Sequence, residues 1–90
     1  MARKPPPAPD PNLAICVWRR GAVWIVSLDS LNTQTGQQDT KFEIVDRPDQ
    51  ASAIHDGRQQ GRWYFCPVYL IDGPPELIQT VPEKGLDHDQ

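Results

Sequence analysis

The sequence lacks the features of a membrane protein or of a secreted one. No apolar run approaches the roughly 18 residues that a membrane-spanning helix needs. Arg3 and Lys4 stand near the start, but prolines follow them where a secretory signal would have its apolar stretch. We therefore expect a soluble, cytoplasmic protein with no membrane partner.

Cysteine and glycine are too few or too scattered for the common metal-binding and phosphate-binding patterns. Cys16 and Cys66 are the only cysteines, and with the histidines they do not give the close spacing of a zinc site. A disulfide between them is geometrically feasible, but a reduced pair of small buried side chains fits a cytosolic chain better. The six glycines are dispersed, so the sequence contains no glycine-rich phosphate loop.

Catalytic side chains are equally sparse. His55 has Asp56 beside it, but adjacent residues of a helix point in different directions, so they do not form an orienting pair. Asp46 and Asp49 are the nearest approach to paired carboxylates, and they are better explained as residues that start a helix. We therefore predict no catalytic residue, no metal site, no cofactor and no enzymatic activity.

Neither sign of charge is in large excess. Nine basic and twelve acidic residues give a net charge of −3, and the two signs balance between residues 13 and 71. A broad basic surface for nucleic acid is therefore not expected. The 90 residues leave room for one small domain.

Proline is the residue in clear surplus, and five of the ten prolines stand among residues 1–11. Because proline fixes φ and donates no backbone hydrogen bond, we predict a disordered arm over residues 1–11. A single domain over residues 12–81 and an acidic, flexible tail over residues 82–90 would follow. Pro6 and Pro9 have the spacing of ligands for aromatic grooves, but this spacing is common, and a solvated arm is the simpler interpretation.

Two runs of β-branched and aromatic residues flank Arg20 and Gly21, which predicts a β-hairpin. If these two residues form the loop, Val17 faces Trp24. Both faces of the hairpin are then apolar, whereas a half-exposed hairpin should alternate. We infer that one face covers the core and that a helix, another strand or a partner covers the second.

The middle of the chain predicts a third strand and a short helix. Residues 41–45 alternate between apolar and charged side chains, which is typical of a half-buried strand. Asp46 is a suitable cap, and the proline and acidic residue that follow it suit a first helical turn. This helix should end near Gly57.

The last part of the folded region predicts further strands. Residues 62–71 form a long strand candidate, which Pro67 restricts to an edge or a bulge, and residues 77–81 form a last short one. We predict an α+β fold: a small antiparallel β-sheet in the order β-β-β-α-β, with an optional fifth strand and one helix on one face. A small barrel of the SH3 or OB type is the alternative.

Aromatic residues stand beside arginines in two places, and these positions are the candidate site. The predicted partner-binding residues are Trp18, Arg19, Arg20, Trp24, Arg58, Arg62, Trp63 and Tyr64. Tryptophan, tyrosine and arginine are enriched in protein-interface hot spots. The same side chains also stack on bases and pair with phosphates. The simpler interpretation is that the rings fill the core while the arginines solvate the hairpin ends.

These observations favour a small non-catalytic interaction module that docks on a larger protein. Such a chain would act as an inhibitor or accessory subunit, including those that mobile elements encode. It would use the aromatic and arginine surface of the hairpin or the exposed edge of the Pro67 strand. Self-association into a homodimer is a variant of this hypothesis. The alternative is a single-stranded nucleic-acid binder, which the balanced charge disfavours.

Overall fold

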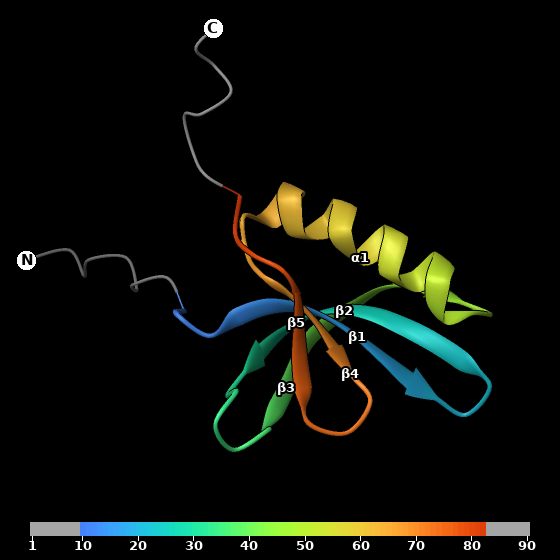
Figure 1. The fold of residues 1–90 in the computed structure, drawn as a ribbon, viewed down its shortest axis with the longest axis horizontal. Coiled ribbons are helices and arrows are strands. Elements are labelled where there is room, and N and C mark those ends of the chain that lie inside the picture. Colours follow the sequence, from blue (N-terminus) through green and yellow to red (C-terminus); the bar gives the residue numbers. More distant parts are fainter. Residues whose placement is uncertain (1–9, 83–90) are drawn as a thin grey trace, which may run out of the picture.

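The computed structural model describes residues 10–82, which form one β-sheet with a single helix across one face (Figure 1). The elements are β1 (Leu13–Arg20), β2 (Val23–Leu31), β3 (Gln38–Arg47), α1 (Gln50–Tyr64), β4 (Val68–Ile71) and β5 (Pro75–Gln79). The predicted α+β fold is confirmed, with the fifth strand present. The sheet is open, with β3 and β5 at its edges, so the barrel alternative is wrong.

The sheet has the strand order β3-β2-β1-β4-β5 and is mixed rather than wholly antiparallel. β4 pairs parallel to β1, while the other neighbouring strands are antiparallel. The physical reason is the helix, which carries the chain back along the sheet so that β4 starts at the same end as β1. The carbonyl of Pro67 accepts a hydrogen bond of 2.9 Å from the Ile15 backbone N–H, which starts this parallel pairing.

The first hairpin forms as predicted, but its loop and register differ. Gly21 and Ala22 separate the strands, and Val17 faces Val26 instead of Trp24. Gly21 has a φ of 63°, a left-handed conformation that suits glycine in a tight turn. Because the register differs by two residues and side chains alternate with period two, every side chain stays on its predicted face.

The two faces of the sheet are completed differently. On one face, Ile15, Val17, Val26 and Leu28 form the main core with α1 lying across them. On the opposite face, a smaller apolar cluster lies beneath partly buried Trp18, Tyr69 and Ile71. Its buried members are Ala14, Cys16 and Leu31. Within residues 10–82 no second helix covers this face, so its own larger side chains provide the cover.

The helix is longer than predicted and does not end near Gly57. It continues to Tyr64, so the predicted strand over residues 62–71 is wrong for its first part. Ala53, Gly57 and Gly61 lie one turn apart and are buried, which gives α1 a smooth stripe that approaches the sheet closely. These glycines are therefore sites of helix–sheet contact, and sequence patterns that treat glycine as a helix breaker misplace the end.

The two ends of α1 are capped in different ways. At its start the cap is Asp49 rather than Asp46, and the Asp49 carboxylate accepts a hydrogen bond of 2.9 Å from the Ser52 backbone N–H. At its end Phe65 adopts a left-handed conformation with a φ of 54°. The Cys66 backbone N–H then donates to the Gly61 carbonyl at 3.1 Å and closes the helix.

The Pro67 strand is not an edge strand. Pro67 immediately precedes β4, which lies between β1 and β5, so both sides of that strand are paired and the predicted free edge is wrong. The last strand is confirmed but begins earlier, at Pro75. Most of the predicted arm over residues 1–11 and of the predicted tail over residues 82–90 falls outside the described part of the chain. No helix among the described residues is long and apolar enough to cross a bilayer.

Candidate partner-binding surface

Large aromatic side chains gather in an exposed group where α1 ends. We call Phe42, Trp63, Tyr64 and Phe65 the aromatic cluster; Trp63 has 77% of its surface exposed. The rings of Phe42, on β3, and Tyr64, on α1, touch with their centroids 6.2 Å apart and their planes at 59°. This contact joins the edge strand to the end of the helix, where Trp63 and Phe65 flank Tyr64 in the sequence.

One of these residues, Phe65, has an uncommon backbone conformation. A positive φ is uncommon for a bulky residue, yet Phe65 holds one with its side chain about half exposed. Strained backbone conformations tend to occur where a side chain serves binding. At Phe65 the left-handed conformation is the C-cap of α1, so the end of the helix accounts for it.

Positive charge lies beside the aromatic cluster. Arg58 and Arg62 are exposed and one turn apart on α1, immediately before Trp63. Neither forms a salt bridge with any residue that the structure describes, whereas Arg20 pairs with Glu43 and Arg47 pairs with Asp56. The cluster thus combines exposed rings with two cations that have no partner in this part of the chain.

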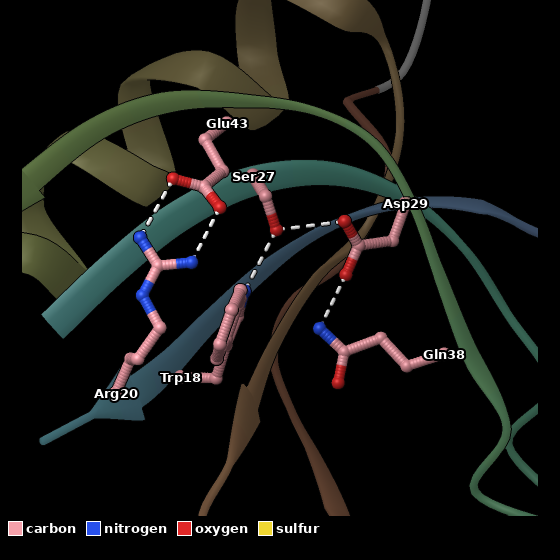
Figure 2. A network of polar contacts seen from close by, with 6 residues as sticks. All are labelled: Trp18, Arg20, Ser27, Asp29, Gln38 and Glu43. Atoms are coloured by element: carbon pink, nitrogen blue, oxygen red, sulfur yellow. Dashed lines mark hydrogen bonds and ion pairs between the residues drawn. The ribbon is translucent and has the colours of Figure 1, made fainter.

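Trp18, in contrast, is held within the fold. Its indole N–H donates to the Ser27 hydroxyl at 2.8 Å, and that hydroxyl donates to the Asp29 carboxylate at 2.7 Å (Figure 2). The Gln38 amide donates to the other Asp29 oxygen at 2.6 Å. Ser27 and Asp29 are fully buried, so this chain of hydrogen bonds satisfies polar groups on the sheet face opposite the helix.

The remaining hairpin residues are also engaged within the domain. Arg20 makes a bidentate pair with Glu43 at 2.7 Å and 3.0 Å, and its guanidinium lies 5.4 Å from the centre of the Trp18 ring. Arg19 donates to the Gly21 carbonyl, and Trp24 packs on the main core. The hairpin residues thus all have contacts within the fold, although Arg19 and Arg20 are exposed. The helix residues are all exposed, and of their rings Tyr64 contacts Phe42.

The predicted site residues that remain as candidates are Arg58, Arg62, Trp63 and Tyr64. Phe42 and Phe65 were not among the residues predicted from the sequence. The alternation of residues 41–45 placed Phe42 on the buried side of its strand, and the exposed edge position of β3 is a property of sheet order. Phe65 was assigned to the predicted strand over residues 62–71 because the helix was predicted to end near Gly57. In both cases tertiary placement, rather than residue type, decides exposure.

His55 and Asp56, the residues weighed for catalysis, line one open surface hollow beside the start of α1, but among the described residues their side chains do not contact each other. His55 contacts the Gln59 amide at 3.4 Å, and Asp56 pairs with Arg47. The Ser52 hydroxyl donates to the Asp49 carboxylate at the helix cap. Among residues 10–82 no three histidine, cysteine or acidic side chains are gathered as metal ligands.

Both cysteines are buried and free, as the sequence favoured. Burial, followed by the nearby Asp29 carboxylate, raises the pKa of the Cys16 thiol, and burial raises the pKa of the Cys66 thiol. Neither thiol is therefore disposed to react in the native protein.

We expect native protein at about pH 8 to leave a disulfide exchange reagent almost unreacted, and guanidinium-unfolded protein to react at both cysteines. Because unfolded thiols ionise near about pH 8.5 while the native ones stay protonated, the free energy of unfolding should fall as the pH rises above that value. Absorbance of the released thiolate measures the reaction. Rapid reaction of native protein would show that Cys16 and Cys66 are accessible.

Comparison of the chain with protein-family models, with curated proteins and with solved structures found no match in any of the three. The functional interpretation therefore depends on the geometry of this surface.

Proposed function

We propose that the protein is a small, non-catalytic interaction module that docks on a larger protein through the aromatic cluster and the adjacent Arg58 and Arg62. The observation that carries the proposal is the exposure of Trp63, at 77%, in a domain whose other two tryptophans are partly buried. Interface hot spots are rich in tryptophan, tyrosine and arginine because these side chains combine large apolar area with a directional polar group.

The neighbouring charges define the chemistry of the partner. Two exposed cations with no salt bridge in the described chain favour a partner that places carboxylates around an apolar or aromatic anchor. Occupation of a site on that partner, as an inhibitor or accessory subunit, is the simplest mode of action. Two free buried thiols fit a reducing compartment such as the cytoplasm.

A single-stranded nucleic-acid binder is the second candidate. The observation that favours it is the position of Trp63 directly after Arg62, since bases stack on exposed rings while arginines pair with phosphates. Binding of a labelled oligonucleotide that weakens steeply from low to moderate salt would support this function. The balance of charge between residues 13 and 71 places it behind a protein partner.

Capture from an extract of the native host, with identification by mass spectrometry, tests the proposal. We expect the wild-type chain to retain one defined protein in near-stoichiometric amount and the double variant Trp63→Ala, Phe65→Gly to lose it. Glycine suits the left-handed backbone at Phe65, so this change removes a ring without straining the helix end.

Leu77→Ala is the matched control, because Leu77 is also a large exposed apolar residue but lies on β5. It should retain the same protein as the wild type. If the double variant captures that protein as well as the wild type does, the aromatic cluster is not the docking surface.

A further inference from the structure

The outer face of α1 contains an open hollow near its start, with a volume of about 570 Å³. Its lining residues are Arg47, Pro48, Ala51, Ser52, His55 and Asp56. Arg47 and Asp56 form an ion pair, and the Ser52 hydroxyl is bound to the helix cap, so part of the polar lining already has partners within the chain. Pro48 and Ala51 add small apolar surface. This lining suits a flat ring with few polar atoms better than a charged ligand.

A ring of that shape stands exposed further along the same face of α1. Trp63 has 77% of its surface exposed and follows Ser52 by eleven residues, which is about three helical turns, so the two side chains lie on one stripe. At about 1.5 Å per residue they are about 16 Å apart along the helix axis. Among the described residues, no strand passes over this side of α1 (Figure 1). One helix thus presents a protruding indole and a hollow in line.

A second copy of the chain can bring these two features together. In an antiparallel pair of helices the order of features is reversed, so the ring of each copy comes opposite the hollow of the other. A two-fold axis beside Gln59, which stands midway between His55 and Trp63, sets Trp63 of each copy over His55 of the other. Such an interface uses the same patch twice and closes at two copies, with both indoles covered.

Charge favours the antiparallel arrangement. Arg62, beside Trp63, is exposed and forms no salt bridge with any described residue. At the hollow, Arg47 balances Asp56, which leaves the Asp49 carboxylate at the helix cap in excess. The antiparallel pair therefore brings opposite net charges together, whereas a parallel pair would bring like charges together. Opposed helix dipoles add to this preference.

We propose that the protein forms a homodimer in which Trp63 of each copy inserts into the hollow beside α1 of the other copy. Two buried indoles account for about 300 to 500 Å² of covered surface, against about 1,200 Å² or more for a stable interface, so the dimer is weak and concentration-dependent. The dimer covers Trp63, so a larger partner would compete with it for the aromatic cluster. This regulatory consequence rests on the proposed function, while the dimer itself needs only this chain.

Sedimentation over a range of concentrations tests the dimer with two variants that act on opposite sides of the contact. Trp63→Ala removes the ring, and Ala51→Lys fills the hollow with a long side chain of the same charge as Arg62. We expect each change to raise the dissociation constant of the dimer by about tenfold or more. Both positions are exposed, so circular dichroism should show both variants folded. Gln60→Lys is the matched control, because it adds the same charge to α1 away from the stripe and should dimerise as the wild type does.

Mixing the two variants separates this contact from any other mode of self-association. Trp63→Ala keeps the hollow and Ala51→Lys keeps the ring, so the mixed dimer contains one intact contact of the two. We expect the mixture to form dimers at concentrations at which each variant alone is monomeric. A wild-type chain that stays monomeric at about 1 mM would overturn the proposal. Dimers that survive either substitution unchanged, or a mixture that stays monomeric, would also overturn it.

The outcome can be separated from that of partner capture. The Ala51→Lys chain keeps Trp63 exposed as a monomer, so it should capture the larger protein at least as well as the wild type does. A monomeric wild type with successful capture rejects the dimer alone. A dimer with capture that ignores Trp63 and Phe65 rejects the partner surface alone.

Discussion

Replacing Gly61 with alanine should destabilise the fold by about 2 kcal/mol, although alanine is favoured over glycine in helices by about 1 kcal/mol. A Cβ at this position would overlap Val68 Cγ2 and would lie 3.2 Å from the Cys66 carbonyl oxygen. The valine is held in the core and the carbonyl belongs to the backbone, so neither neighbour moves away cheaply. Overpacking therefore outweighs the gain in helix propensity.

Replacing Gly57, one turn earlier in α1, should destabilise the fold less than replacing Gly61. A Cβ at Gly57 would meet Val17 Cγ2 at 2.8 Å with no backbone atom among its nearest neighbours, so Gly57→Ala should cost less than Gly61→Ala. Urea unfolding measures both. The combination of Gly61→Ala with Val68→Ala should be less destabilised than the sum of the single changes, since each relieves the other. A stabilised Gly61→Ala variant would show that the helix does not approach the sheet this closely.

Replacing Asp29 with alanine should cost about 3 kcal/mol, the largest effect expected from a single polar side chain. The change removes the acceptor of two short hydrogen bonds, from the Ser27 hydroxyl and the Gln38 amide, in a fully buried position. The Ser27 hydroxyl would be left buried without an acceptor and the Gln38 amide partly buried without one, which is more costly than the loss of the bonds themselves.

Asp39→Ala is the control for Asp29→Ala, because Asp39 is exposed on the adjacent strand. Its effect should stay within about 0.5 kcal/mol. Denaturant unfolding of the two variants measures the difference. Near-equal stabilities would mean that the network with Trp18 contributes little, and that Trp18 would be free to leave the sheet.

The order of elements could be predicted from the sequence because it depends on local patterns. The apolar runs on either side of Gly21 specify a hairpin, and period-two alternation keeps each side chain on its face even though the loop is one position away from that predicted. The start of the helix was also recognisable, to within one turn, from its acidic residues and proline.

The rest depended on contacts between distant residues. Gly57 and Gly61 look like breakers in isolation, and only the close approach to Val17 and Val68 explains why a helix contains them. The parallel pairing of β1 with β4 follows from that longer helix. Local patterns cannot supply either fact.

The candidate site was recoverable only in part, for the same reason. An apolar second hairpin face suggested that some surface awaited a partner, but Trp18 and the buried Asp29 complete that face from within. The more exposed aromatic side chains are instead at the end of α1, where Trp63 is exposed. Residue type identified two places where arginine stands beside an aromatic residue, and only tertiary structure shows which of the two has the more exposed rings.

The dissociation constant of the captured protein, measured by titration calorimetry, tests the location of the docking surface most directly. We predict that Trp63→Ala weakens binding by about 30-fold, the scale of a hot-spot side chain, while Leu77→Ala changes it by less than about threefold. Circular dichroism should show both variants folded, since both side chains are exposed. Equal affinities for the wild type and Trp63→Ala would contradict the assignment of the aromatic cluster as the binding surface.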